Sequence, residues 1–258
     1  MKFILSHVPK TGGKSFDLYI RTCLGLKDKD VFRLNNQKMA RTIRGFDQTF
    51  IDATQLVYAQ SLYCTFAGLP PEYKRVTILR DPVDRAVSQF GYFKHFRRDN
   101  LSVGRIIRDE HWTIDDFISP YNDVAMFYLF PLVLMFGCES YDHSTYEPDR
   151  LVETAKKVLD GFDFVGFTDR YREDMDRFAN EFNMHGELTR ENKTPSYKRI
   201  TITDSQRKRY TDILEREYEV YNHIRRQYDQ DSSRGGYKPQ RRLEPCKESH
   251  WYRGHIRV

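Results

Sequence analysis

The sequence predicts an α/β fold in which a central, mostly parallel sheet is flanked by helices. Three short apolar runs have the length and composition of buried strands. They are Lys2–Val8, Arg75–Arg80 and Asp163–Phe167. Each run leads into a segment with helical periodicity, and strands that alternate with helices in this way are typical of a parallel sheet.

Apolar residues recur with helical spacing in five segments. In chain order these are Ser15–Leu24, the stretch from Pro82 to about Arg98, Asn122–Phe136, Asp169–Phe182 and Thr203–Tyr228. Pro131 interrupts the third segment, because a proline lacks the N–H that a helix interior needs. Asp204 is the predicted N-cap of the last helix, since a short side-chain oxygen there accepts from free backbone N–H groups.

The chain of 258 residues is predicted to form one domain over residues 1–230, followed by a basic tail at 231–258. The tail has seven Lys and Arg residues against three Asp and Glu residues, so it carries +4 of the net charge of +5. It is rich in Gly, Pro and Arg and is interpreted as a solvated extension. The remaining domain is close to neutral, which argues against a nucleic-acid-binding protein.

Composition also bears on the compartment and on metal sites. No apolar run is long enough to cross a bilayer and no signal peptide is recognisable, so we expect no membrane partner. The four cysteines are widely separated: Cys23, Cys64, Cys138 and Cys246. This spacing fits neither a disulfide framework nor a zinc site, and no two histidines have metal-ligand spacing. We therefore expect reduced thiols, no metal and a cytoplasmic protein.

The most informative segment follows the first predicted strand and reads Val-Pro-Lys-Thr-Gly-Gly-Lys-Ser from Val8 to Ser15. A strand, a glycine pair and a helix start bring backbone N–H groups together, and the helix dipole favours an anion there. Two lysines add positive charge and two hydroxyls add donors. The predicted ligands of a phosphate or sulfate are Lys10, Thr11, Gly12, Gly13, Lys14 and Ser15.

Two other interpretations of this segment stay open. Gly13-Lys14-Ser15 matches the end of the nucleoside-triphosphate loop G-x-x-x-x-G-K-[ST], which would indicate a nucleotide kinase or another nucleoside-triphosphate enzyme. Val8, however, stands where that loop requires its first glycine. A glycine pair between a strand and a helix can also be a tight turn and nothing more.

A second phosphate-type motif follows the second predicted strand. Arg80 closes that strand, Asp81 can cap the next helix, and Pro82 occupies the first turn, where proline is tolerated. Ser88 lies two helical turns after Asp81 and therefore on the same face. Arg80 and Ser88 are thus predicted to converge on one anion. Arg85, one turn after Asp81, is predicted to form an ion pair with it.

These two motifs carry a resemblance to a known family. The segment His7–Phe16 resembles the 5′-phosphosulfate loop of sulfotransferases that use 3′-phosphoadenosine 5′-phosphosulfate (PAPS). It is closest to the branch that includes the heparan sulfate 2-O- and 6-O-sulfotransferases, in which a Thr usually stands at the position of Lys14. Arg80 and Ser88 have the separation of that family's 3′-phosphate site, in a setting similar to its L-R-D-P-x-x-R-x-x-S-x-[FY] pattern.

The resemblance spans roughly residues 1–228 and implies a three-layer, P-loop-like domain. It implies PAPS as cofactor and 3′-phosphoadenosine 5′-phosphate (PAP) as product, with Lys10 stabilising the leaving phosphate. Lys193 and Thr194 lie in a segment similar to a loop that closes over the nucleotide in relatives. We expect a small-molecule acceptor with a hydroxyl or an amine, such as a natural product or toxin, because this chain has no membrane anchor like those of glycan-modifying relatives.

The general base departs from the family pattern. Glycan 2-O-sulfotransferases use a His in a motif like Y-H-G-H-V-x-[YF], and in the similar stretch Val57–Tyr63 that position holds Gln60. Glutamine cannot accept a proton at neutral pH. His111 is therefore the predicted catalytic base, with Glu110 as the alternative, whereas His7 is interpreted as a hydrogen-bonded histidine at a strand end. A PAPS-binding protein without catalytic activity stays an alternative to the enzyme.

Overall fold

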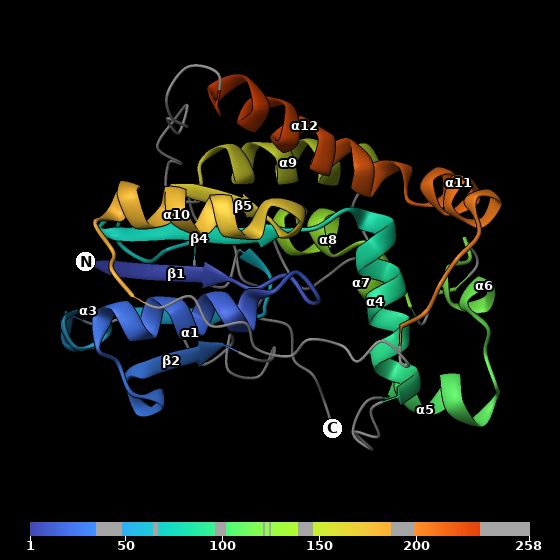
Figure 1. The fold of residues 1–258 in the computed structure, drawn as a ribbon, viewed down its shortest axis with the longest axis horizontal. Coiled ribbons are helices and arrows are strands. Elements are labelled where there is room, and N and C mark those ends of the chain that lie inside the picture. Colours follow the sequence, from blue (N-terminus) through green and yellow to red (C-terminus); the bar gives the residue numbers. More distant parts are fainter. Residues whose placement is uncertain are drawn as a thin grey trace, which may run out of the picture.

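The computed structural model of the chain describes residues 1–34, 48–63, 67–95, 102–120, 122–123, 125–138, 147–186 and 199–232. Several predictions fall outside these ranges: the cofactor loop with Lys193 and Thr194, the thiols of Cys64 and Cys246, and nearly all of the basic tail. The described ranges form a three-layer α/β fold, which confirms the predicted fold class (Figure 1).

Five strands form one sheet in the order β2-β3-β1-β4-β5, and every pair of neighbours runs parallel. Their bounds are β1 Lys2–Ser6, β2 Val31–Leu34, β3 Leu56–Ala59, β4 Tyr73–Leu79 and β5 Phe164–Phe167. Strands β1, β4 and β5 lie at the three predicted runs. The sequence does not predict β2 and β3 as strands, because four residues are too few to show a clear alternation.

Alternate side chains of the strands face opposite helical layers. Phe3 and Leu5 of β1 contact one layer, and Ile4 between them contacts the other. One layer consists of α1 Gly13–Leu24 and α10 Tyr171–Phe182, and the other of α8 Pro131–Gly137, α9 Pro148–Asp160 and α12 Glu215–Ser232. Because β1 is covered on both faces, its sequence is a nearly continuous apolar run.

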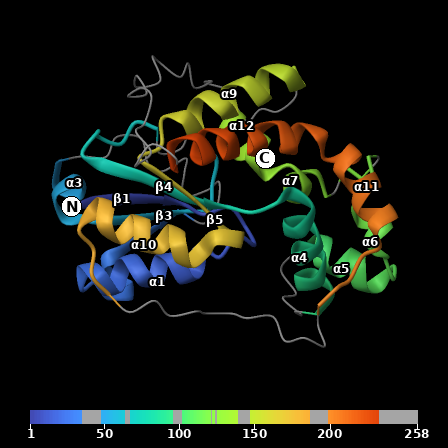
Figure 2. The ribbon, with the colours of Figure 1, turned by 45° about the horizontal axis from the view of Figure 1, so that its top comes forward.

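A smaller group of helices lies beyond the carboxyl ends of the strands (Figures 1 and 2). It comprises α4 Pro82–His95, α5 Ser102–Asp109, α6 Ile114–Phe117, α7 Met126–Leu129 and α11 Asp204–Ile213. These helices share a core that includes Phe90, Phe93 and Phe117. In both views α4 stands between the sheet and the pair α5 and α6, so α4 borders the sheet edge at which β1 ends.

The N-cap of helix α11 lies one residue before the predicted cap. Thr203, not Asp204, is the N-cap: its Oγ1 accepts the N–H of Gln206 at 3.2 Å, and the Gln206 side chain accepts the N–H of Thr203 at 3.0 Å. This reciprocal pair satisfies two N–H groups, which a cap at Asp204 would not do. The predicted long helix is also broken at Leu214 into α11 and α12, whereas Pro131 separates α7 from α8 as predicted.

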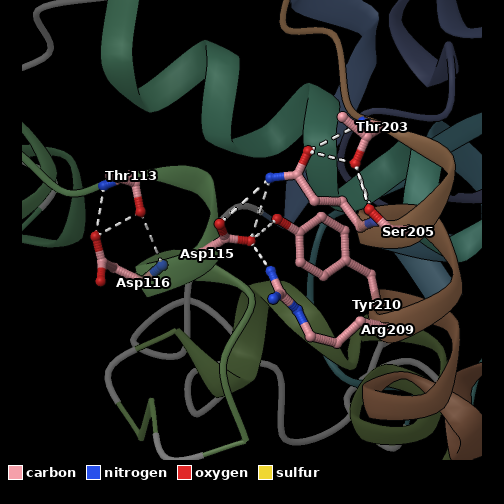
Figure 3. Close-up of polar contacts among 8 residues, drawn as sticks. Thr113, Asp115, Asp116, Thr203, Ser205, Arg209 and Tyr210 are labelled. Atoms are coloured by element: carbon pink, nitrogen blue, oxygen red, sulfur yellow. Dashed lines mark hydrogen bonds and ion pairs between the residues drawn. The ribbon is translucent and has the colours of Figure 1, made fainter.

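A polar cluster fixes α11 on α6 (Figure 3). The carboxylate of Asp115 in α6 accepts from the side chains of Gln206, Arg209 and Tyr210 in α11. The hydrogen bond from Tyr210 is the main reason that the pKa of Asp115 lies below its usual value. The start of α11 is therefore held against α6 by charge-assisted hydrogen bonds.

The remaining short elements connect the layers. They are η1 Asp28–Asp30, α3 Gln48–Ala53 and η3 Thr168–Arg170. None of the helices in the described ranges combines the length and the apolar character needed to cross a membrane.

Candidate anion-binding site

The first loop joins β1 to α1 at the carboxyl edge of the sheet. Its backbone is left-handed at Lys10, with φ of 69°, and at Gly12, with φ of 88°. Glycine adopts this conformation freely, whereas for lysine it costs about 1–2 kcal/mol. Ser15 and Phe16 donate their N–H groups to the carbonyl of Gly12 at 3.0 and 3.2 Å, so α1 starts directly after the loop. The positive end of the α1 dipole therefore meets the loop.

Two threonine hydroxyls hold the loop in place. Thr11, only 1% exposed, donates to the carbonyl of Val8 at 2.8 Å. Thr168 Oγ1 lies 2.9 Å from the carbonyl of Thr11 and 3.0 Å from that of Leu79, so a residue just after β5 links the loop to the end of β4. The Thr11 hydroxyl proton is used inside the loop, and an anion would meet the Thr11 backbone N–H instead.

His7 lies under Gly13 and makes a glycine necessary there. A Cβ at Gly13 would stand 1.8 Å from Nδ1 of His7. Burial, with smaller effects from the charges of Lys14 and Lys10, lowers the pKa of His7 to about 3. The His7 backbone N–H donates to Ala59 at 2.7 Å, but Nδ1 is buried with no hydrogen-bond partner in the described ranges. His7 is thus a neutral packing residue and not the side-chain hydrogen-bonding residue that the sequence suggested.

The two sequence motifs meet at this edge. Arg80, directly after β4, donates from Nη1 to the carbonyl of Lys10 at 3.2 Å, across 70 positions of the chain. Burial, together with the charges of Arg80 and Lys14, lowers the pKa of Lys10 to about 8. Burial also lowers the pKa of Arg80. Lys14 is exposed and Ser15 is buried in the first turn of α1. The arrangement concentrates positive charge at one place, which is the property of an anion site.

One face of α4 is turned toward the first loop. Asp81 caps this helix as predicted, since its Oδ1 accepts the N–H of Asp84 at 2.9 Å. Half-buried Ser88 and Tyr92 are one turn apart and therefore share a face. The Nζ of Lys10 lies 4.5 Å from the centroid of the Tyr92 ring, which directs that face toward the loop. Ser88 is thus on the side of α4 that faces the first loop.

Sequence reasoning missed Tyr92 and Thr168. The signal for Tyr92 was its position one helical turn after Ser88, on a face already assigned to the ligand. The signal for Thr168 was a hydroxyl directly after the third apolar run, because parallel strands end at the same edge of a sheet. Each of these signals also fits many other residues, and only the strand order shows that Tyr92 and Thr168 lie at the first loop.

Arg85 does not form the predicted ion pair with Asp81. Its side chain is 1% exposed, and Nη2 donates to the carbonyls of Tyr128 at 2.6 Å and Leu129 at 2.9 Å. The contact with Asp81 is the ordinary helical hydrogen bond from the Arg85 N–H at 2.9 Å. The reason is orientation: at this point of α4 the Arg85 side chain faces the interior, where the end of α7 offers carbonyl groups.

The residues considered for the general base lie in two different places. Gln60 directly follows β3, is exposed, and donates its N–H to Leu34 at 2.9 Å. Because Ala59 pairs with Ser6, Gln60 stands beside the start of the first loop. His111 and Glu110 are exposed in the turn between α5 and α6. Both of these helices lie on the side of α4 away from the sheet (Figures 1 and 2). The structure thus brings Gln60, and not His111, to the sheet edge.

The described side chains include no group of three or more His, Cys, Asp or Glu residues placed to hold a metal ion. No protein-family model matches this chain, and no curated protein matches its sequence. The site is therefore defined by its own chemistry: three cationic side chains, a glycine-rich backbone and a helix N-terminus at the carboxyl edge of a parallel sheet.

Proposed function

We propose that this protein is a PAPS-dependent sulfotransferase that transfers a sulfuryl group to a hydroxyl or an amine of a small acceptor molecule. The observation that carries the proposal is the hydrogen bond from Arg80 to the carbonyl of Lys10, which joins the two phosphate-type motifs. A nucleotide with both a 3′-phosphate and a 5′-phosphosulfate needs cationic groups at two places on one surface. Lys10 and Arg80 meet that need, and both motifs resemble those of this family.

The charges of the site fit a polyanion. The pKa of Lys10 is lowered to about 8 by burial and by Arg80 and Lys14, so these cations repel one another in the protein alone. An anion at the loop would relieve the repulsion while it forms its own hydrogen bonds. Gly12 is exposed and has no side chain, which leaves the backbone N–H groups accessible to such a ligand.

Each residue of the site has a role in the proposed reaction. Bound PAPS supplies the sulfuryl group, and the bond that breaks joins sulfur to the bridging oxygen of the 5′-phosphate. Lys10 would donate to that oxygen and neutralise the charge that develops on it. Arg80 and Ser88 would hold the 3′-phosphate. The 5′-phosphate would be held by the rest of the first motif, namely the Thr11 backbone, Gly12, Gly13, Lys14 and Ser15.

The acceptor loses a proton when the new bond to sulfur forms. Gln60, beside the first loop, can orient an acceptor through its amide but cannot take the proton. His111 stays the predicted base. Its position beyond α4 would require an acceptor that extends past that helix or a water molecule that relays the proton.

The described residues that directly follow β3 and β4 disfavour a nucleoside-triphosphate enzyme, because they offer no free carboxylate for Mg²⁺. Such enzymes hold Mg²⁺ with a carboxylate at the end of a strand near the phosphate loop. After β3 the chain has Gln60 and Ser61, and after β4 it has Asp81. Asp81 caps α4 and accepts from the hydroxyl of Tyr218 at 2.7 Å, so its oxygens already have structural partners.

Thermal unfolding with three nucleotides tests the proposal. At 100 times its dissociation constant PAP adds about 2.7 kcal/mol, which is about 5–10 °C for a domain of this size. Adenosine 5′-monophosphate, which differs from PAP only in lacking the 3′-phosphate, is the matched control and should bind more weakly. A shift with Mg-ATP and none with PAP would favour the triphosphate enzyme. A shift with PAP but no transfer from PAPS to any hydroxyl or amine acceptor would favour a binding protein without catalytic activity.

A further inference from the structure

We infer that Tyr92 is a positioning residue for Lys10, whose ammonium its ring holds at the sheet edge. The distance of 4.5 Å from Nζ to the ring centroid lies well within the range of cation–π attraction. The kinetic consequence of this inference rests on the proposed function, whereas the contact itself does not.

Lys10 is held at both ends by the same part of the chain. Its carbonyl accepts from Arg80, two residues before the start of α4, and its ammonium lies over Tyr92 in the third turn of that helix. Between these contacts the Lys10 backbone is left-handed, with φ of 69°. A residue with so unfavourable a backbone conformation persists only when its surroundings fix it. The two contacts with the β4–α4 unit supply that constraint.

Tyr92 is itself held firmly enough to position a partner. It is half-buried and packs against the core shared by α4, α5, α6, α7 and α11. Its ring centroid lies 6.0 Å from that of Phe93, which is buried in the same core. The orientation of the ring is therefore set by the helix and its core, and the orientation of the ammonium is set by the ring.

An aromatic ring is better suited than a carboxylate to position the Lys10 ammonium. A carboxylate beside Lys10 would neutralise the charge that an anionic ligand needs and would repel that ligand. The face of a tyrosine ring attracts an ammonium group without cancelling its charge. It also favours the protonated form of Lys10, against burial and the charges of Arg80 and Lys14, which act in the other direction.

Two variants at position 92 separate the contribution of the tyrosine ring to kcat from that of its hydroxyl. Tyr92→Leu removes the aromatic face, and we expect kcat with PAPS to fall about 2- to 30-fold while the affinity for PAP stays within about 2-fold. Tyr92→Phe keeps the face and should retain kcat. Lys94→Ala is the matched control: it removes a lysine 5.6 Å above the Phe90 ring of the same helix and should leave kcat unchanged. A Tyr92→Phe enzyme as slow as Tyr92→Leu would overturn the inference.

A double-mutant cycle shows whether Tyr92 acts through Lys10. In a Lys10→Ala background, Tyr92→Leu should cause no further loss of kcat, because the group that the ring positions is already gone. Additive losses in the double variant would mean that Tyr92 acts independently of Lys10 and would overturn the inference.

Nuclear magnetic resonance of the lysine side chains tests the contact between Lys10 and Tyr92 without any measurement of enzymatic activity. The ring current of Tyr92 should move the ε-methylene protons of Lys10 upfield in the wild type and in Tyr92→Phe, and Lys10→Ala assigns the signal by its loss. This measurement needs only the wild type if Tyr92→Leu does not fold. No upfield signal would overturn the inference even in an active enzyme. An upfield signal in a protein that transfers no sulfuryl group would support the contact and reject the proposed function.

Discussion

Arg80 and Arg85 belong to the same sequence motif, and the fold uses their charges in different ways. Arg85 is 1% exposed and donates to the carbonyls of Tyr128 and Leu129 at the end of α7. Arg80 is half-buried and donates to the carbonyl of Lys10, where other positive side chains gather. One arginine therefore joins two helices, and the other stands at the sheet edge beside the first loop.

The acidic partner explains the difference between the two regions. Glu217 of α12 is buried and close enough to Arg85 to favour its charged form. Its carboxylate accepts the N–H groups of Leu132 at 2.8 Å and Val133 at 3.1 Å. Arg85 and Glu217 thus hold the end of α7 and the start of α8, and each favours the charged form of the other. At the first loop the strongest Coulombic effects on Lys10 come from other cations. The carboxylates of Asp84 and Asp81 favour the charged form of Arg80, so it too has acidic neighbours. The two arginines differ in the burial of those acids: Glu217 is fully buried, whereas Asp81 and Asp84 are partly exposed.

The largest effect should come from Arg85→Ala. Removing the Arg85 side chain leaves the carbonyls of Tyr128 and Leu129 without their donor and takes a favourable charge away from the buried Glu217 carboxylate, which together should cost about 3–5 kcal/mol. Urea unfolding should therefore show a loss of that size, while the affinity of the folded variant for PAP changes little. Arg80→Ala is the control and should cost less than about 1 kcal/mol in unfolding. Equal losses of stability in the two variants would contradict the comparison.

Lys10→Ala should show the opposite behaviour. We expect kcat with PAPS to fall about 10²- to 10³-fold, as for other donors aimed at a developing charge. The unfolding temperature should stay nearly constant, because a loop lysine contributes little packing. Steady-state kinetics and thermal unfolding of one preparation measure both quantities. A normal kcat with a raised KM for PAPS would mean that Lys10 binds the ground state and the transition state equally.

The pH dependence of stability should identify Glu217. Burial raises its pKa from the usual 4.5 to about 7, although Arg85 and two backbone N–H groups oppose the shift. The folded state then binds this proton more tightly than the unfolded state does. The resulting stabilisation is complete below about pH 4.5 and is lost as the pH rises through about 7, a change of about 3 kcal/mol.

His7, whose pKa is lowered to about 3, changes the stability in the opposite direction over part of this range. The measurement is therefore the free energy of unfolding in urea, compared between Glu217→Gln and the wild type from pH 4.5 to 8. We expect the stability of the variant relative to the wild type to rise with pH, because Gln does not titrate. If the difference in unfolding free energy is constant over this range, Glu217 is not the group that titrates.

Arg80→Ala should have the smallest of these effects, and it tests nucleotide selection. A charge-assisted hydrogen bond contributes about 1.5–3 kcal/mol, so the affinity for PAP should fall about 10- to 150-fold in titration calorimetry. Ser88→Ala should lose less, because a hydroxyl carries no charge. Binding of adenosine 5′-monophosphate should change little in either variant. Equal losses for both nucleotides in Arg80→Ala would show that Arg80 does not contact a 3′-phosphate.

Local patterns in the sequence located much of the fold. The apolar runs before Pro9 and Asp81 predicted β1 and β4, and the glycine pair predicted the start of α1. These signals are strong because a buried strand, a glycine pair and a capping Asp act over a few residues. The cap of α11 was misplaced by one residue, since Thr203 and Asp204 are both good capping residues and only the partner Gln206 decides between them.

The sequence by itself determined that two strand–loop–helix units would carry basic residues in their loops, because periodicity, glycine and proline act locally. The tertiary structure decided what each charge does. Arg80 meets Lys10 across 70 positions, and Thr168 meets Thr11 across 157, because β4 lies beside β1 in the sheet and β5 lies beside β4. Arg85 becomes structural because α4 turns its side chain toward the end of α7. Such contacts depend on strand order and helix rotation, which packing of the whole chain sets.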